Sequence, residues 1–288
     1  YKRQESYRHM CRFQSGFFFE HPLTYELGLE YYWRVEPYVE LNCDIDYDPF
    51  MFMKINNKAY GFTITLLEYE ETIPTLWDHT KHFMKLHPDY FASDNLVEFV
   101  IDNGDFETSN YNLCHFWSNF EIGDINFFRS RQYKDYFEYL DKTGGFFYER
   151  WGDAPVHSIA ASLFLNKSQV YHFKDIGYVH DGMGHCPLGE KQFHENGKCD
   201  CNVVDSVTLL EDFCMGDWWF ASKEGKPSER EEYKALIDEL ELEDVWVEEG
   251  EGEGEGEGEG EGQEDENAGD ENLEVFDRRH LKKRYSSA

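Results

Sequence analysis

The sequence is poor in basic residues and has no long apolar run. Its 288 residues include 59 Asp and Glu but only 27 Lys and Arg, which gives a formal charge of −32. Because nucleic-acid phosphates and anionic lipids select surfaces rich in Lys and Arg, this balance argues against both as partners. A membrane-spanning helix needs ~18–20 consecutive apolar residues, and no stretch of that length occurs. The first residue is Tyr1 rather than Met. We therefore expect a fragment or processed product whose targeting segment has been removed.

The acidic charge is concentrated at the C-terminal end. Residues 231–288 hold 22 acidic and 6 basic side chains, and Glu and Gly alternate from Glu249 to Gly262. Such a segment repels itself and loses much backbone entropy on ordering, so it predicts a disordered acidic tail. Aromatic residues make up 17% of the chain, enough for a sizeable core. We therefore predict a globular domain over residues 1–230 and a tail over residues 231–288.

Strand-like and helix-like segments alternate within the predicted domain. β-Branched and aromatic runs predict strands over residues 60–67, 111–120 and 171–173. Helices are predicted over residues 74–86, 125–143 and 153–165, the second ended by Gly144 and Gly145. This alternation favours an α/β fold, with a mixed sheet flanked by helices, over a sandwich or a bundle.

Carboxylates lie among aromatic residues in four segments, and each buried one needs a partner, a cap role, a metal or a substrate. They are Glu36, the group Asp44, Asp46 and Asp48, Glu121, and the pair Glu149 and Asp153. Simple structural roles suit several of them: an Asx turn for Asp48, a salt bridge with Arg150 for Glu149, and a helix cap for Asp153. Glu121 is predicted to end a strand, where α/β proteins bind ligands.

Two further motifs have the residue types of a metal site. Asp44-Ile45-Asp46 has the Asp-x-Asp form with which sugar-nucleotide enzymes hold a divalent cation, although so short a motif is common. His180 follows a strand-like run and precedes a glycine-containing loop, so it is a candidate metal ligand or else a surface imidazole.

The cysteines cluster late in the domain. Four of the seven are Cys186, Cys199, Cys201 and Cys214, in a turn-rich segment without the Cys-x-x-Cys spacing that structural zinc sites favour. Disulfides formed in an oxidising compartment are the better interpretation. The sequon Asn166-Lys167-Ser168 is consistent with that compartment.

Long segments in order over residues 5–220 resemble one family, the fungal Golgi α-1,2-mannosyltransferases (glycosyltransferase family 15). They include YYWRVEPYVELNCDIDYDPF at 31–50, YNLCHFWSNFEI at 111–122, GGFFYERWGDAPVHSIAASLFLNK at 144–167 and HFKDIGYVH at 172–180. The resemblance implies a GT-A-like fold. It also implies that mannose is transferred from GDP-mannose to a mannose-terminated glycan of a glycoprotein or glycolipid, with Mn²⁺ as cofactor and retention of anomeric configuration.

The resemblance also assigns site residues. Glu121 matches the proposed nucleophile or oxocarbenium-stabilising glutamate, and Asp153 a carboxylate of the acceptor region. His180 matches the manganese-binding histidine, Glu36 the glutamate near the metal and diphosphate, and Tyr7 a tyrosine near the nucleotide phosphates. On this basis Asp44-Ile45-Asp46 is structural. The chain departs from the family at Tyr38, where the Glu-Pro-Asp segment reads Glu36-Pro37-Tyr38.

The family consists of type II membrane proteins of the Golgi, so the resemblance predicts a luminal domain whose anchor, stem and first α/β segment lie outside this chain. Two alternatives stay open. One is a catalytically silent luminal paralogue that binds glycans or partner proteins. The other is a retaining glycosidase that uses Glu121 and Asp153, which would need carboxyl groups ~5–5.5 Å apart.

Overall fold

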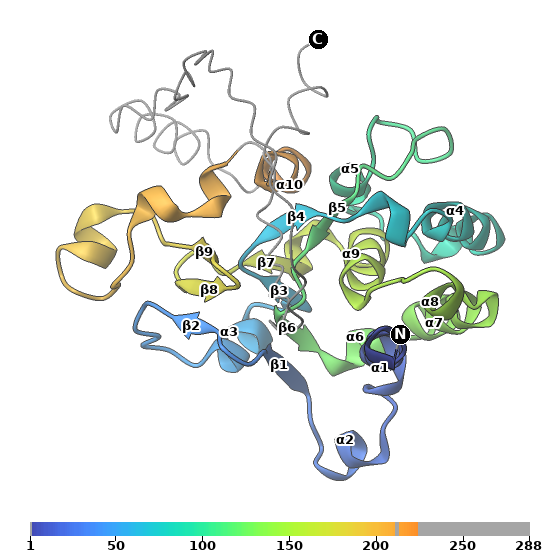
Figure 1. Cartoon of the computed structure of the whole chain (residues 1–288), viewed down its shortest axis with the longest axis horizontal. Helices are drawn as coiled ribbons and strands as arrows, with labels where there is room; N and C mark the ends of the chain where they lie inside the picture. Colours follow the sequence, from blue (N-terminus) through green and yellow to red (C-terminus); the bar gives the residue numbers. More distant parts are fainter. Residues whose placement is uncertain (1, 211–212, 224–288) are drawn as a thin grey trace, which may run out of the picture. The chain divides into compact units, whose positions relative to one another are not determined.

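The computed structural model describes residues 2–210 and 213–223. The chain divides into two compact units, residues 1–240 and 241–288, and the second lies outside the described residues. The described part is a mixed α/β fold, as the sequence predicts (Figure 1). The Glu-Gly segment and most of the predicted tail fall outside it.

Three small sheets form the β layer. The largest has the strand order β1-β6-β3-β7, formed by Tyr31–Val35, Phe120–Asp124, Tyr60–Phe62 and Val170–His172. Its first three strands are antiparallel neighbours, and β7 is parallel to β3. A second sheet joins β2 (Glu40–Leu41), β8 (Tyr178–His180) and β9 (Met183–His185), and a third pairs β4 (Thr65–Leu67) with β5 (Cys114–Phe116). The main sheet therefore places β6 between β1 and β3.

Helices cover the main sheet chiefly on one side. They are α1 (Lys2–Arg12), α2 (Pro22–Glu26), α3 (Pro49–Ile55), α4 (Leu76–Leu86), α5 (Val97–Val100), α6 (Ile125–Phe128), α7 (Arg131–Thr143), α8 (Gly145–Tyr148), α9 (Asp153–Phe164) and α10 (Met215–Ser222). The larger apolar core joins α4, α7 and α9 to one face of the sheet. A smaller core packs α3 and β8 against the opposite face, through residues such as Met53, Phe120 and Tyr178. We call these the helical face and the β8 face.

The predicted helices over residues 74–86 and 153–165 are confirmed within two residues. The predicted helix over residues 125–143 is two helices, because Ser130 caps α7 with its side chain and interrupts the run. Gly144 ends α7 in the left-handed region with φ +80°, which glycine adopts without a steric cost, as predicted. Gly145 instead begins α8, and a Cβ there would lie 2.2 Å from the ring of Trp151.

Two predicted strands are wrong in their extent. The run over residues 60–67 is divided between β3 and β4, which belong to different sheets. The run over residues 111–120 holds only β5, and a new strand, β6, starts at Phe120. Periodicity does not show where a strand leaves one sheet for another, so the sequence predicts a single strand for each continuous apolar run.

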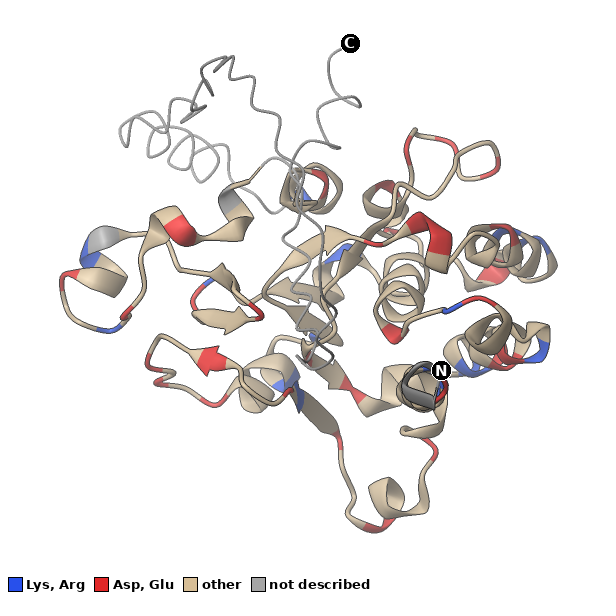
Figure 2. Ribbon diagram, in the orientation of Figure 1, with Lys and Arg blue, Asp and Glu red and all other residues tan. Residues whose placement is uncertain are grey.

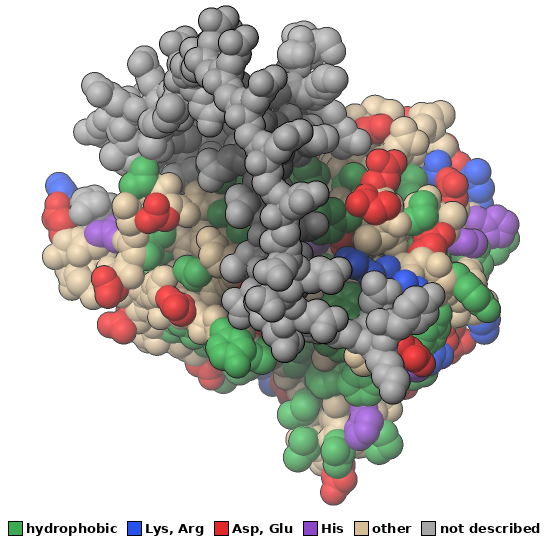
Figure 3. Space-filling model, viewed as in Figure 1, with side chains coloured by type: hydrophobic (Ala, Val, Ile, Leu, Met, Phe, Trp, Pro, Cys, Tyr) green, Lys and Arg blue, Asp and Glu red, His purple; other side chains and the backbone are tan. Residues whose placement is uncertain are grey.

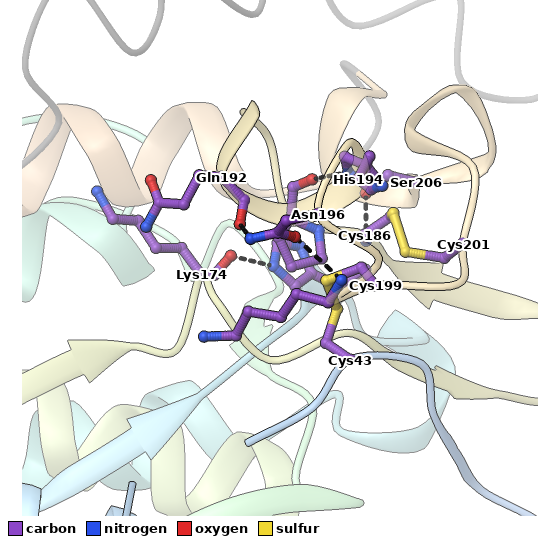
Figure 4. Close-up of a disulfide and its surroundings, with 12 residues drawn as sticks. Cys43, Lys174, Cys186, Gln192, His194, Asn196, Cys199, Cys201 and Ser206 are labelled. Carbon is purple, nitrogen blue, oxygen red and sulfur yellow. Dashed lines mark hydrogen bonds between the residues drawn. A yellow bond between two sulfur atoms is a disulfide. The ribbon is translucent and has the colours of Figure 1, made fainter. Parts of the chain in front are cut away.

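Three disulfides tie the later segments to the β layer. They are Cys43–Cys199, Cys114–Cys214 and Cys186–Cys201. All four predicted cysteines are bonded, but only Cys186 and Cys201 pair within the predicted group. Figure 4 shows two of the bridges beside the loop in which Asn196 donates a hydrogen bond to the Gln192 carbonyl oxygen, at 2.8 Å. Cys11 is a free thiol, fully buried.

Figure 2 shows Asp and Glu positions along many of the described elements, with scattered Lys and Arg positions that form no continuous basic stripe. Exposed apolar side chains gather on α2, where Leu23, Tyr25 and Leu27 are each more than half exposed (Figure 3). Among the described residues, no helix combines the length and apolar character needed to cross a membrane.

Because two histidines are buried, we expect the free energy of unfolding to fall in acid. His172 and His185 have ring centroids 5.2 Å apart, and burial lowers the pKa of both, that of His185 to about 4. The unfolded chain binds protons near the ordinary value of 6.5, whereas folded His185 does not bind one until pH 4. Stability should therefore fall as the pH drops from 6.5 to 4, by about 3 kcal/mol from His185.

This prediction is checked by urea unfolding at a series of pH values, with His185→Gln as the comparison. The variant should lose part of the acid dependence, since glutamine does not titrate. An identical acid dependence in both proteins would contradict the prediction.

Candidate active site

Neighbouring strands place Arg34 and Glu121 side by side on the helical face of the sheet. Arg34 of β1 and Phe62 of β3 are the register partners of Glu121 in β6. Residues directly opposite one another in antiparallel strands share a face. Tyr32 and Tyr60, the partners of Gly123, lie on this face as well. The sheet thus gathers one guanidinium, one carboxylate and two phenols in its centre.

Helix α9 supplies the opposite side of the site. Asp153 is its first residue and His157 lies four residues later, so the two side chains project from the same side of the helix. Asp153 accepts hydrogen bonds from Arg34 Nη1 and from Ser118 Oγ, the latter at 2.7 Å. His157 Nδ1 lies 3.0 Å from Glu121 Oε2. Each acidic group therefore faces a basic one.

Asp153 is not the helix cap predicted from the sequence, because Gly152 occupies that position and no side chain caps the helix. The carboxylate is instead 4% exposed and paired with Arg34. Burial raises the pKa of Asp153, but the charges of Arg34 and His157 and the hydrogen bond from Ser118 outweigh it and lower the pKa below its ordinary value. Asp153 is accordingly an ionised group that shares Arg34 with the next carboxylate.

Glu36 is that second carboxylate. Its Oε1 accepts from Arg34 Nε at 2.7 Å and lies 2.6 Å from Nη2. Arg34 and Glu36 are two residues apart at the end of β1, so the guanidinium connects the sheet centre to the sheet edge. Residue type and spacing did not single out Arg34 for this central role. The alternation Trp33-Arg34-Val35-Glu36, with two charges at spacing two, is the signal that could have indicated it.

Glu121 differs from its predicted position. It lies inside β6 rather than at the end of a strand, and it is 1% exposed. Three polar groups surround its carboxylate. Tyr32 Oη donates to Oε1 at 2.8 Å, Tyr60 Oη donates to Oε2 at 2.8 Å, and His157 Nδ1 lies 3.0 Å from Oε2. Oxygens of Glu121 and Asp153 and a ring nitrogen of His157 all lie within 4.8 Å of one another. Glu121 and Asp153 therefore form one buried acidic pair.

Gly123 makes room for this arrangement. A Cβ at Gly123 would lie 2.6 Å from Tyr32 Cε1 and 2.7 Å from Phe128 Cε2. The Tyr32 ring packs over Gly123 of β6, and its hydroxyl donates to Glu121. Glycine is thus required so that the phenol can reach the carboxylate.

His180 lies on the β8 face, with its ring centroid 5.5 Å from that of Trp117. Its Nδ1 is buried without a hydrogen-bond partner, and its Nε2 is 3.4 Å from Asp181 Oδ2. Ser118, which follows Trp117 in the chain, donates to Asp153. His180 therefore packs against a residue adjacent to one that binds the acidic pair.

Tyr178 lies two residues before His180 in β8. Its hydroxyl is buried without a hydrogen-bond partner. Burial raises the pKa of Tyr178, and the charges of Glu36 and Asp181 raise it further. The unpaired Nδ1 of His180 and the Glu36 carboxylate are therefore two candidate donors in this part of the structure. These donor types, neutral imidazole and carboxylate, suit Mn²⁺.

Tyr7 lies over the Asp153 end of the site. Burial raises the pKa of Tyr7, and the neighbouring Cys11 and Asp153 raise it further. Burial and the charge of Asp153 also raise the pKa of the Cys11 thiol, to about 12. Both groups therefore stay protonated. Arg150 packs over the Tyr7 ring at 5.6 Å, so helix α1 is held against the start of α9.

The remaining candidates have structural positions. Asp44 and Asp46 are exposed, and Asp46 Oδ2 binds Lys198 Nζ at 3.2 Å, as expected for a structural motif. Asp48 caps α3 by accepting from the backbone of Phe50 and Met51. The proposed pair of Glu149 with Arg150 is wrong, because Glu149 binds Thr75 and Trp151.

Solved structures of mannosyltransferases have the same fold. Core-mannan synthase A from Aspergillus fumigatus, in an Mn/GDP form, has a TM-score of 0.67 at 43% identity, covering 75% of this chain and 59% of that one. The mannosyltransferase Ktr4p from S. cerevisiae in complex with GDP has a TM-score of 0.67 at 40% identity, covering 80% and 59%. The fold and the site together place the chain among mannosyltransferase-like proteins.

The family model described as glycolipid 2-alpha-mannosyltransferase matches residues 1–223, and the chain belongs to this family. O-glycoside alpha-1,2-mannosyltransferase omh1 of Schizosaccharomyces pombe is 54% identical over 221 residues, which is 77% of this chain and 55% of that protein. Alpha-1,2 mannosyltransferase KTR1 of Saccharomyces cerevisiae is 51% identical over 223 residues, 77% of this chain and 55% of that one. The chain spans about half the length of the curated relatives it matches.

Proposed function

We propose that this chain is part of a retaining α-1,2-mannosyltransferase that moves mannose from GDP-mannose to a mannose-terminated glycan. The observation that carries the proposal is the buried acidic pair of Glu121 and Asp153, linked through Arg34 to Glu36 at the sheet edge. The relatives named above are mannosyltransferases, and two solved relatives were crystallised with GDP. We further propose the Golgi lumen as the compartment, with the complete protein anchored in the membrane.

In the proposed reaction, Glu121 stabilises the positive charge that develops at the anomeric carbon, or attacks that carbon and yields retention by two inversions. Asp153 holds Arg34 in place and orients the acceptor hydroxyl. Tyr7, which is 45% exposed, contacts the nucleotide phosphates. Glu121 is buried here, so the sugar would approach from the Arg34 and Asp153 end of the acidic pair.

A bound Mn²⁺ would neutralise the charge of the departing diphosphate as a Lewis acid. His180, through its unpaired Nδ1, and Glu36, through Oε2, would hold it. Tyr38 supplies no third carboxylate. The chemistry of these two donors, an imidazole nitrogen and a carboxylate oxygen, suits the ion.

Retaining glycoside hydrolysis is disfavoured by the charge state of the pair. A glycosidase needs one protonated carboxyl group as general acid near neutral pH. Asp153 instead has a lowered pKa and is paired with Arg34. It is therefore a poor proton donor to a leaving group.

The proposed function is tested by incubating the chain with GDP-mannose, Mn²⁺ and methyl α-mannoside. We expect GDP and an α-1,2-linked disaccharide as products, and loss of both on chelation with EDTA. Release of free mannose without disaccharide would identify a hydrolase instead. Binding of GDP and Mn²⁺ without either product would favour the silent paralogue.

Tyr38 is the specific observation that favours the silent paralogue. It is 96% exposed and has φ +62°, a conformation that Asp and Asn adopt more readily than Tyr. Tyr38→Asp should therefore be tolerated and should increase Mn²⁺ affinity about tenfold if this position faces the ion. Tyr38→Asn is the matched control, because it gives the same backbone relief without charge. Titration calorimetry measures both, and equal affinities would show that position 38 does not face the metal.

A further inference from the structure

Four charged groups alternate in sign between the sheet and α9. Arg34 and Glu121 are register partners on β1 and β6, and Asp153 and His157 are one turn apart on α9. Arg34 pairs with Asp153, and His157 pairs with Glu121. We call this set the charge quartet. Because it is largely buried, a neutral total charge is strongly favoured, and that requires one proton on either His157 Nδ1 or Glu121.

The hydrogen bonds of His157 place one hydrogen on Nε2. Nδ1 faces the Glu121 carboxylate at 3.0 Å, and Nε2 faces the Gln14 carbonyl oxygen at 3.2 Å. A carbonyl oxygen only accepts, so Nε2 must carry a hydrogen. The remaining proton lies either on Nδ1 or on Glu121.

The two tyrosines decide where this proton lies. Tyr32 and Tyr60 each place a hydroxyl 2.8 Å from a different oxygen of Glu121. Burial and the Glu121 charge raise the pKa of both phenols far above the ordinary value, so both keep their protons and donate. A carboxylate that receives two such bonds favours ionisation, which leaves the proton on the imidazole. Burial lowers the pKa of His157, but Glu121 and Asp153 raise it overall.

The donors are unevenly divided between the two oxygens of Glu121. Oε2 receives both Tyr60 and His157, whereas Oε1 receives Tyr32 alone. A carboxylate oxygen has two acceptor positions. Oε2 is therefore filled, and Oε1 keeps one free lone pair.

We propose that His157 is a positioning residue, held as an imidazolium, which fixes Glu121 as a carboxylate with Oε1 directed toward the sugar. The inference rests on the proposed function for its catalytic meaning. The charge state of His157 does not depend on it.

The first experiment is nuclear magnetic resonance of the full chain labelled with ¹⁵N-histidine. His157→Gln identifies the resonances of the ring among those of the twelve histidines. If that variant does not fold, Tyr60→Phe identifies them instead, because it removes a bond to the same carboxylate. We expect both ring nitrogens of His157 to carry hydrogen at pH 7. One bare nitrogen at that pH would overturn the proposal, whether or not the chain transfers mannose.

The second experiment measures transfer kinetics. His157→Phe suits the surrounding Phe19, Phe128 and Tyr133 rings but donates no hydrogen bond. It should lower kcat about 10²-fold and leave KM for the donor within twofold, since the carboxylate loses its orientation. His157→Gln, which keeps a donor, should recover part of the loss. His172→Gln, a change at a buried histidine outside the quartet, is the matched control.

Wild-type kcat in His157→Phe would overturn the positioning role. An inactive wild-type chain would instead count against the proposed function and leave the resonance experiment as the test of the charge state.

Discussion

Glu121→Gln is expected to reduce mannose transfer about 10³-fold while Mn²⁺-dependent GDP binding stays unchanged. The amide is nearly isosteric, but it cannot stabilise a developing positive charge or attack the anomeric carbon. Glu36 and His180, proposed to hold the ion, do not contact Glu121. Initial rates with GDP-mannose and methyl α-mannoside measure the loss, and calorimetry with GDP and Mn²⁺ measures binding.

Glu138→Gln serves as the control, because Glu138 lies on the exposed surface of α7 with its side chain 61% exposed. It should transfer mannose at the wild-type rate. Since Glu121→Gln also leaves the His157 imidazolium without its counter-charge, unfolding must be measured in parallel. A folded Glu121→Gln chain with near-normal turnover would exclude Glu121 as the catalytic carboxylate.

Arg34→Met is expected to destabilise the protein by about 3–5 kcal/mol. Its guanidinium is the shared partner of Asp153 and Glu36, and the Asp153 side chain is only 5% exposed. Removing one member of a buried ion pair leaves the other charge uncompensated, which costs more than the pair contributes. Urea unfolding at pH 7 measures the change.

The matched control is Arg12→Met. Arg12 also binds an aspartate, Asp141, but those side chains are 31% and 22% exposed, so the loss should be below about 1 kcal/mol. Combining Arg34→Met with Asp153→Asn should cost clearly less than the sum of the single changes, because the second removes the stranded charge. Equal losses for the Arg34 and Arg12 variants would contradict the central role of Arg34.

The fold class could be predicted because helix signals are local. The N-cap Ser130, the left-handed Gly144 and the apolar spacing of α4 act within a few residues. Sheet membership is not local. Thr63 and Ile64 belong to a run of strand-forming residues, yet the chain changes sheets there. The change occurs because β3 pairs with β6 whereas β4 pairs with β5, and both partners lie about fifty residues or more further along the chain.

The site was predictable only in part for the same reason. The family resemblance marks Glu121 and Asp153, and the structure brings them together. His157 was missed because in the segment Asp153-Ala-Pro-Val-His157 it reads as one polar residue inside a buried helix. Arg34 was missed because its charge has meaning only once β1, β6 and α9 meet. Pairing across elements, rather than residue type, defines the charge quartet.

The disulfides of this domain differ in how long the first cysteine of each pair must wait during synthesis for its partner. Cys43 and Cys199 are 156 residues apart, and Cys114 and Cys214 are 100 apart, whereas Cys186 and Cys201 are separated by 15. A ribosome that adds about 5–20 residues per second delivers Cys199 many seconds after Cys43. Until Cys186 is added, the thiols present in residues 1–185 are those of Cys11, Cys43 and Cys114. The burial of Cys11 in the folded domain keeps this thiol from competing for a partner once the later cysteines emerge.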